Sequence, residues 1–267
     1  MKVLRNVLKK QKNMKIINKN IAVIILAAGL GTRMKSSKAK VLHEVFGRPM
    51  IMYVVKTAIK IAGNNVILVI GHQAEKVRKI VLEENEVFFS IQGKQLGTGH
   101  AVSCALPNLP DNIEDVIILC GDVPLLTFDT VKKFLDDHLK ARRDISVLGV
   151  KIDKPKGYGR ILFDKNKHVC KIVEEADASE EEKFVKTINS GVYCVRKKVL
   201  FDVLNKIKSD NIQGEIYLTD IIEIGYREEK NVGSMIVADY EEFIGVNSLD
   251  DLKKIEAIMQ KNKGKIS

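Results

Sequence analysis

Apolar residues along the chain fall into short continuous blocks separated by amphipathic stretches. Blocks of this kind predict strands that are buried on both faces, and they occupy residues 21–26, 66–70, 87–91 and 116–119. Between them, apolar residues recur three and four positions apart, which is the period of a helix. The first half of the chain is therefore predicted to form a doubly wound α/β fold, with a mostly parallel sheet between two layers of helices.

Local signals mark where several helices begin and end. Pro49 lies near the first position of a helix that ends at Ala62, just before Gly63. Thr127 is suited to cap a helix over residues 127–141, and Ser248 to cap a last helix over residues 249–261. Further helices are predicted at residues 73–83, after Gly99, at 197–206 and at 217–227.

The pattern changes after Ile145. Residues 161–163 and 169–173 flank a short polar turn, which predicts an antiparallel hairpin. Residues 187–195 and 233–238 are predicted as further strands. The second half of the chain is therefore expected to add a mixed lobe to the same sheet.

Charge is distributed unevenly along the chain. The net charge is +10 over 267 residues, but residues 1–20 hold seven basic residues and no acidic one. Residues 21–267 keep a net charge of +3, the difference between +10 and those seven, which does not indicate a nucleic-acid function. We expect residues 1–20 to form a disordered basic tail and residues 21–267 a single domain. A weak targeting segment and an extension upstream of a true start at Met14 are alternatives for residues 1–20. Binding of nucleic acid through the tail is kept as an alternative.

Cysteine usage and hydropathy are typical of a cytoplasmic protein. The four cysteines form no Cys-x-x-Cys pair and no zinc-like cluster with histidine, which favours buried thiols in a reducing compartment. The longest apolar run, residues 21–30, is too short to span a bilayer. Residues 1–20 lack the apolar core of a secretory signal. We therefore expect no membrane as a partner.

The first predicted strand leads directly into a glycine loop. Gly29 and Gly31, at the end of a strand, allow backbone amides to approach a phosphate closely. Met34 stands where a dinucleotide fingerprint needs its third glycine, and Gly31-Thr32-Arg33 differs from the Gly-Lys-Ser/Thr of a P-loop. The flanking cations Arg33 and Lys40 suit the phosphates of a nucleoside triphosphate. A solvated basic turn fits the loop equally well.

Further motifs follow this loop in a fixed order. They are Lys-Val-Leu-His (40–43), Gly-Arg-Pro-Met (47–50), Gln-Leu-Gly-Thr-Gly-His-Ala (95–101), Gly-Asp-Val-Pro-Leu (121–125), Gly-Tyr-Gly-Arg (157–160), Ile-Val-Glu-Glu (172–175), Asn-Ser-Gly-Val-Tyr (189–193) and Gly-Val-Asn (245–247). The series resembles the sugar nucleotidyltransferase superfamily, and within it the uridylyltransferase domain of bacterial UDP-N-acetylglucosamine pyrophosphorylases. The resemblance covers about residues 21–250. It implies a Rossmann-like fold with a nucleotide-binding part at about 21–125 and a sugar-binding part at about 126–247.

The resemblance also implies a role for each matching residue. Leu26, Ala27, Ala28 and Gly29 would lie on the nucleotide, and Gln92, Gly97 and Thr98 would recognise uracil and ribose. Arg33 and Lys40 would be catalytic residues on the phosphates, while Asp122 and Asn247 would hold Mg²⁺ as the cofactor. The sugar 1-phosphate would meet Gly159, Glu174, Asn189, Thr219 and Asn247.

Elementary chemistry agrees with several of these roles. Asp122 follows a buried strand at the edge where open α/β sheets bind ligands, although a turn aspartate before Pro124 is its plain alternative. Mg²⁺ keeps water and phosphate oxygens as ligands, so one Asp and one Asn are adequate. Lys35 and Lys38 are expected to be solvated. The histidines are expected to be structural, because an attacking sugar phosphate is already anionic.

The chain departs from the family pattern at three positions beside the expected site. Ala39 stands where proline is frequent, Cys120 where an aromatic residue is frequent, and Leu30 where lysine is common. None of these changes removes an expected functional residue. They affect the expectation about rate and substrate more than the reaction type.

The reaction expected from the resemblance joins UTP to N-acetylglucosamine 1-phosphate and releases pyrophosphate, a step toward cell-wall precursors. Another sugar 1-phosphate or nucleoside triphosphate, and a catalytically silent sugar-nucleotide sensor, are alternatives. Only 20 residues follow Asn247, and they are predicted as one helix and a lysine-rich end. We therefore expect no acetyl-transferring β-helix and no acetylation of the sugar. The sequence does not indicate an oligomeric state.

Overall fold

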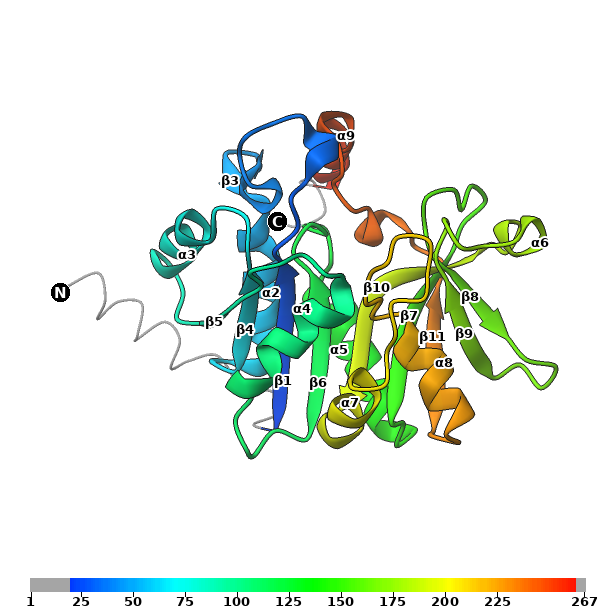
Figure 1. The fold of residues 1–267 in the computed structure, drawn as a ribbon. Helices are drawn as coiled ribbons and strands as arrows, with labels where there is room; N and C mark the ends of the chain where they lie inside the picture. Colours follow the sequence, from blue (N-terminus) through cyan, green and yellow to red (C-terminus); the bar gives the residue numbers. More distant parts are fainter. Residues whose placement is uncertain (1–19, 263–267) are drawn as a thin grey trace.

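A nine-stranded sheet runs through residues 20–262, the part of the chain that the computed structural model describes (Figure 1). Seven strands are ordered β11-β7-β10-β6-β1-β4-β5, and β8 and β9 extend the sheet from β10. The expected basic tail, residues 1–20, lies outside the described residues except for Asn20.

Four strands make the parallel half of the sheet: β1 (Ile21–Ala27), β4 (Val66–Ile70), β5 (Phe88–Ile91) and β6 (Asp115–Cys120). β1 lies in the middle, where Ile24 pairs with Ile67 of β4 and with Ile118 of β6. Because both faces of β1 are covered, its sequence has to be apolar throughout rather than alternating. This half confirms the doubly wound fold that the sequence predicts.

The second half of the sheet is mixed. β10 (Thr187–Arg196) pairs antiparallel with both β6 and β7 (Ile145–Lys151), and β11 (Val232–Val237) pairs parallel with β7. The predicted hairpin is confirmed as β8 (Arg160–Phe163) and β9 (Val169–Val173). The mixed lobe therefore continues the same sheet, as expected.

The sequence pattern does not predict β7, and this is a correction. The sequence pattern changes after Ile145, but Ile145 itself begins a strand. The first six residues of this strand are buried. Gly149 interrupts the apolar run in the middle of that strand. An added Cβ at Gly149 would lie 2.6 Å from Ile236 Cδ1 and 2.7 Å from Ile161 Cδ1, so the glycine permits close packing between strands.

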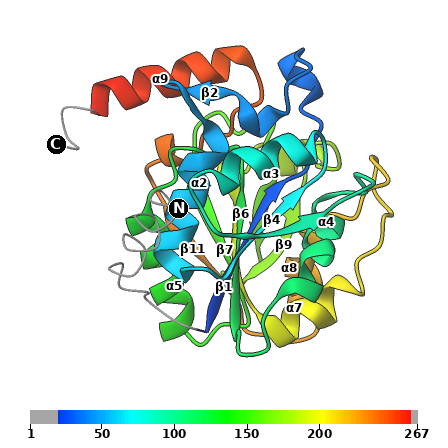
Figure 2. The same cartoon turned by 90° about the vertical axis from the view of Figure 1, so that its left-hand side faces the viewer.

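Helices cover both faces of the sheet (Figure 2). One face buries apolar side chains of α2 (Met50–Ala62), α3 (Ala74–Leu82) and α5 (Phe128–Lys140). The other buries those of α4 (Thr98–Ala105), α7 (Lys197–Leu204) and α8 (Asp220–Arg227). No helix among residues 20–262 is long and apolar enough to cross a membrane.

Helix boundaries agree with the local signals, with one exception. Thr127 caps α5, because its Oγ1 accepts a hydrogen bond of 3.2 Å from the Thr130 amide. Ser248 Oγ accepts one of 3.2 Å from the Asp251 amide at the start of α9 (Leu249–Asn262). The helix expected from residue 217 is wrong in its start, since α8 begins at Asp220. Residues 214–217 are extended or irregular and 218–219 form a turn.

Short elements connect the glycine loop with the carboxyl end of the chain. The loop expected at residues 29–40 contains one turn of 3₁₀ helix, η1 (Thr32–Met34), and a second turn, η2 (Lys40–Leu42), begins at its last residue. β2 (Glu44–Val45) and β3 (Arg48–Pro49) form a small ribbon that follows them. Met34 of the loop shares an apolar cluster with Val246 and with Ile255 of α9. This packing brings residues near 247 back to the loop, at the upper edge of the sheet in Figure 1.

Candidate active site

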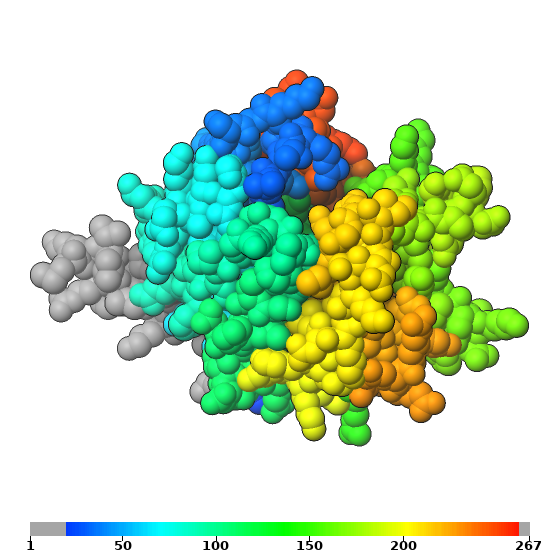
Figure 3. Space-filling model, in the orientation of Figure 1, coloured from blue at the N-terminus to red at the C-terminus, as the bar shows by residue number. Residues whose placement is uncertain are grey.

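A cavity of about 400 Å³ lies at the carboxyl ends of β1, β5 and β6, which is where open α/β sheets bind ligands. In the space-filling view, the blue segment after β1 lies above blue-green α4, and the yellow segment before α8 lies beside α4 (Figure 3). Nine residues expected in the site line this cavity: Leu26, Ala27, Ala28, Gly29, Lys40, Gln92, Gly97, Thr98 and Asp122.

The glycine loop closes over Lys40. Gly31 has φ 66°, a conformation that disfavours side chains, and an added Cβ would lie 2.6 Å from Lys40 Cβ. Gly29 faces open space, with no atom within 4 Å of an added Cβ. Gly31 is therefore required by packing, whereas Gly29 leaves room on the cavity side.

Four of the expected residues form one charged cluster beside the cavity. Lys40 Nζ makes an ion pair with the Asp122 carboxylate and donates a hydrogen bond of 2.7 Å to Asn247 Oδ1. Arg33 Nη2 donates to the same Asn247 oxygen at 2.8 Å. The Val246 amide donates to the Asp122 carbonyl at 2.9 Å, which fixes the two segments together. Residues up to 214 positions apart thus share one cluster.

Asp122 and Asn247 supply the oxygen atoms that the sequence assigns to a metal. Among residues 20–262, no group of three or more His, Cys, Asp or Glu is placed to hold an ion. A carboxylate and an amide oxygen nevertheless fit Mg²⁺, which retains water and phosphate ligands. Both oxygens also bind the Lys40 ammonium, so this site already favours a cation.

Gln92 and Gly97 lie together at the side of the cavity. The Gln92 side chain is only 4% exposed, and its Nε2 donates to the Gly97 carbonyl at 3.0 Å. The same Nε2 lies 3.1 Å from His100 Nδ1. His100 therefore helps to orient Gln92, in agreement with the structural role expected for the histidines.

The residues expected to meet the sugar also lie close together. The Asn189 amide donates to the Gly159 carbonyl at 2.9 Å, and Asn189 Nδ2 donates to Tyr193 Oη at 2.7 Å. An added Cβ at Gly159 would lie 3.2 Å from Glu174 Oε2. Glu174 lines a second cavity, of about 490 Å³, between β9 and α8. Gly159 thus leaves room for the carboxylate that the sequence places in the sugar pocket.

Burial controls the ionisation of this region. It raises the pKa of Glu174 above its ordinary value, and the adjacent Thr219 hydroxyl acts in the opposite direction. The Thr219 Oγ1 and Tyr217 Oη atoms are buried, and neither has a partner of ordinary hydrogen-bond geometry among the described residues. Burial, followed by repulsion from Glu223, raises the pKa of Asp220 to about 6. The hydroxyl groups of Thr219 and Tyr217 are therefore enclosed by the fold, and Thr219 acts on the Glu174 carboxylate from within it.

Eight residues that line the nucleotide cavity are absent from the set that the sequence predicts. Cys120, Gln95 and Glu215 are three of them. Burial raises the pKa of the Cys120 thiol to about 12, so it is a neutral part of the wall. Gln95 opens the motif at residues 95–101 and Cys120 directly precedes the motif at 121–125, which is the signal that could have found them. Glu215 precedes a segment interpreted as a helix start.

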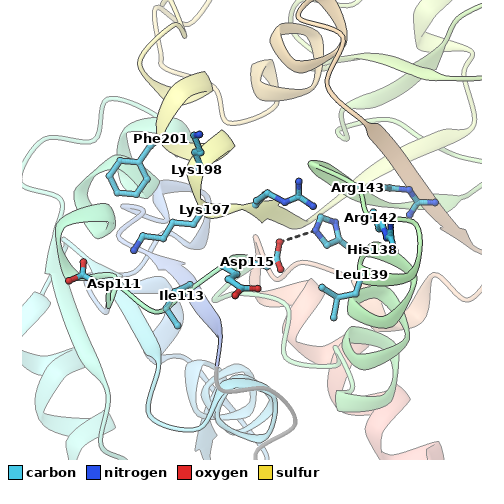
Figure 4. Close-up of a pocket in the computed structure, with 12 residues that line it drawn as sticks. Asp111, Ile113, Asp115, His138, Leu139, Arg142, Arg143, Lys197, Lys198 and Phe201 are labelled. Carbon is cyan, nitrogen blue, oxygen red and sulfur yellow. Dashed lines mark hydrogen bonds and ion pairs between the residues drawn. The ribbon is translucent and has the colours of Figure 1, made fainter.

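A larger cavity, of about 800 Å³, lies at the opposite edge of the sheet (Figure 4). There, His138 Nε2 is 3.3 Å from Asp115 Oδ1, and His138 Nδ1 is 2.8 Å from Ser146 Oγ. The order resembles a nucleophile triad, but Ser146 is fully buried and cannot reach a substrate. The three side chains satisfy one another inside the fold, so this cavity is not the candidate active site.

Comparison with known proteins agrees with this choice. The family model described as a MobA-like NTP transferase domain matches residues 23–205. The bifunctional protein GlmU of Caldanaerobacter subterraneus subsp. tengcongensis is 47% identical over 239 residues, which are 89% of this chain and 51% of that protein. GlmU of Geotalea daltonii is 43% identical over 240 residues, 90% of this chain and 52% of its own length. The chain thus spans about half the length of these relatives.

Solved structures share the fold. A protein from Bacillus anthracis described as a glucose-1-phosphate thymidylyltransferase, in complex with a sucrose, aligns with a TM-score of 0.71 at 19% identity. The alignment covers 89% of this chain and 94% of that one. HddC from Yersinia pseudotuberculosis, complexed with GMP-PN, aligns with a TM-score of 0.63 at 25% identity and covers 89% of this chain and 99% of its own.

Proposed function

Because the chain belongs to the MobA-like NTP transferase domain family, we propose that it transfers the uridylyl group of UTP to N-acetylglucosamine 1-phosphate. The products are UDP-N-acetylglucosamine and pyrophosphate. The observation that carries the proposal is the cluster of Arg33, Lys40, Asp122 and Asn247 beside a glycine-lined cavity. The GlmU relatives, which are more than 40% identical over this part, support the choice of substrates.

The reaction is an in-line displacement at phosphorus. An oxygen of the sugar phosphate attacks the α-phosphorus, the bond to the bridging oxygen of the β-phosphate breaks, and pyrophosphate leaves with that electron pair. Both reactants are anions, so the protein has to offset their repulsion. Arg33 and Lys40 stabilise the negative charge that grows on the departing pyrophosphate.

Asp122 and Asn247 would hold Mg²⁺, which when bound supplies positive charge shared by the two reacting phosphates. The Asp122 carboxylate and the Asn247 amide oxygen are the donors that this ion prefers. In our proposal, Lys40 leaves these oxygens for the phosphates of the nucleotide. The lysine then neutralises substrate charge instead of protein charge.

Selectivity would arise from polar groups at both ends of the site. Gln92 and the Gly97 backbone, already joined by a hydrogen bond, would present a fixed edge to uracil. Glu174 and Asn189 would bind hydroxyl and acetamide groups of the sugar. A substrate that lacks such a group leaves a buried polar atom unpaired, which can lower kcat/KM by several powers of ten.

Pyrophosphate release across four nucleoside triphosphates and several sugar 1-phosphates, with Mg²⁺ present, tests the proposal. We expect the highest kcat/KM with UTP and N-acetylglucosamine 1-phosphate. A strong preference for another pair would replace the substrates while keeping the reaction class. Binding of UDP-N-acetylglucosamine without turnover of any pair would instead make the protein a sugar-nucleotide sensor.

A further inference from the structure

A short segment before α8 joins the nucleotide cavity to the sugar lobe. We call residues 215–219 the bridging segment. Its Ile216 amide donates to the Leu96 carbonyl at 2.8 Å, and the Ile216 carbonyl accepts from the Gly99 amide at 2.8 Å. These two backbone hydrogen bonds fix the segment beside the loop at 96–99.

Gly97 makes this contact possible. Its φ is 114°, and an added Cβ would lie only 2.4 Å from the Ile216 carbonyl oxygen and 2.7 Å from the Ile216 nitrogen. Both neighbours are backbone atoms, which cannot rotate away. The loop and the bridging segment therefore approach as closely as two backbones can.

A hydrogen bond to the Thr98 side chain also joins the two segments. Thr98 Oγ1 accepts from the Leu218 amide at 2.9 Å. Leu218 is 3% exposed and packs in the apolar layer below α4, α7 and α8. The hydroxyl thus fixes the backbone at the residue just before Thr219.

The bridging segment contributes one residue to each of the two cavities. Glu215 lines the nucleotide cavity with Gln92 and Gly97, whereas Tyr217 lines the second cavity with Glu174. Thr219 is 4% exposed and lies beside Glu174. A displacement of the Leu218 backbone would therefore move the groups that surround the Glu174 carboxylate.

We propose that Thr98 is a positioning residue for the sugar 1-phosphate, because its hydroxyl holds the bridging segment at the geometry in which Thr219 and Tyr217 frame Glu174. This inference rests on the proposed function for the identity of the substrates. It assigns the Thr98 side chain to the sugar side of the site, although Thr98 lies in the loop expected to recognise the nucleotide. The backbone of that loop keeps the nucleotide role.

Thr98→Val tests the proposal, because it removes the hydroxyl and conserves the shape of the side chain. Loss of one hydrogen bond is expected to raise KM for the sugar 1-phosphate about fivefold, with KM for the nucleotide within about twofold. Thr98→Ser retains the acceptor and is expected to restore the wild-type KM. Ser103→Ala is the matched control, since the Ser103 hydroxyl donates to the Gly99 carbonyl at 3.1 Å within α4 and does not touch the bridging segment.

Amide hydrogen exchange provides a second measurement that needs no substrate. We expect the Leu218 amide to exchange faster in Thr98→Val than in wild type, Thr98→Ser or Ser103→Ala, with equal melting temperatures. Unchanged exchange at Leu218 overturns the proposal whatever the substrates are. An equal rise in both KM values, or a rise for the nucleotide alone, also overturns it.

Failure of the proposed function gives a different result. It would appear as absent pyrophosphate release by the wild-type protein with UTP and N-acetylglucosamine 1-phosphate. The KM values are then measured with the pair that the wild type does turn over, and the exchange of Leu218 is measured in every case.

Discussion

At the scale of single residues, charge balance dominates the candidate site. Lys40 is largely buried and shares its ammonium between Asp122 and Asn247, whereas Lys38 lies in the same loop and pairs with the exposed Glu44 at 3.1 Å. A cation held beside the cavity can act on phosphate charge without reorganising. A cation in solvent has no such effect, so we expect the two lysines to differ in function despite their proximity.

Replacement of each lysine by methionine measures this difference. Lys40→Met is expected to lower kcat by about 100-fold, the order of magnitude for loss of one preorganised charge contact. Lys38→Met is the matched control and should remain within about twofold of wild type. Initial rates of pyrophosphate release at saturating substrates give both numbers. Equal kcat values for the two variants would mean that Lys40 does not act on the phosphates and resembles the solvated Lys38.

Asp220 provides a pH-dependent measurement on the sugar lobe. Its pKa is raised from 3.8 to about 6, mainly by burial, so the folded protein holds this proton to a higher pH than the unfolded chain. The stability from that proton is present below pH 4 and is lost as pH rises through 6. Asp220→Asn should therefore stabilise the protein at pH 7.5, by on the order of 1 kcal/mol because the carboxyl is only half buried.

Melting temperatures at several pH values test the Asp220 expectation. The difference between Asp220→Asn and wild type should be near zero at pH 4 and should increase between pH 4 and 7. Asp250→Asn is the control, since the Asp250 side chain is 93% exposed. A constant difference across this range would mean that Asp220 does not titrate as described.

At the scale of elements, the sequence predicts helices and strands best where the signal lies in neighbouring residues. The apolar block of β1 and the Thr127 cap of α5 are both readable from neighbouring residues, and both are confirmed. β7 cannot be predicted in this way, because Gly149 interrupts its apolar run. Glycine is found there because side chains of other strands pack against it. The start of α8 is displaced because residues 216–218 bind the distant loop at 96–99. Such long-range contacts leave no periodic trace in the sequence.

Gly149 gives a prediction at this scale. Gly149→Ala would place a methyl group between Ile161 and Ile236, at distances that require both side chains to shift. We expect a loss of roughly 1–2 kcal/mol in the free energy of unfolding, measured by urea denaturation. Gly93→Ala is the control, because an added Cβ there meets no atom within 4 Å. If the two variants unfold at the same urea concentration, the strands around Gly149 are less closely packed than described.

At the scale of the whole molecule, the candidate site depends on how the chain returns to its starting region. Arg33 and Asn247 lie 214 positions apart, yet they share a hydrogen bond because α9 packs on the glycine loop. The composition of the site could be predicted from the motif series. Its geometry could not, since the Lys40 ion pair and the bridging segment depend on tertiary packing. The identities of the residues and their spacing therefore carry more information about chemistry than about shape.

The basic tail is the remaining feature at this scale. Its deletion distinguishes nucleotidyl transfer from nucleic-acid binding as the function of the protein. The motif series begins at Leu26, and among the described residues, 20–262, the candidate site and the sheet need no contribution from the tail. Deletion of residues 1–19 should therefore leave kcat, KM and the melting temperature unchanged within error.

Seven cations are lost with that segment, which leaves a net charge of +3 on the rest of the chain. Any attraction to nucleic acid should weaken sharply, because such binding depends on the number of phosphates neutralised. Binding of a single-stranded RNA oligonucleotide at several salt concentrations, alongside pyrophosphate release, measures both properties on the same two proteins. A truncated protein that melts normally but loses turnover would place the tail in the catalytic site, against the expectation here.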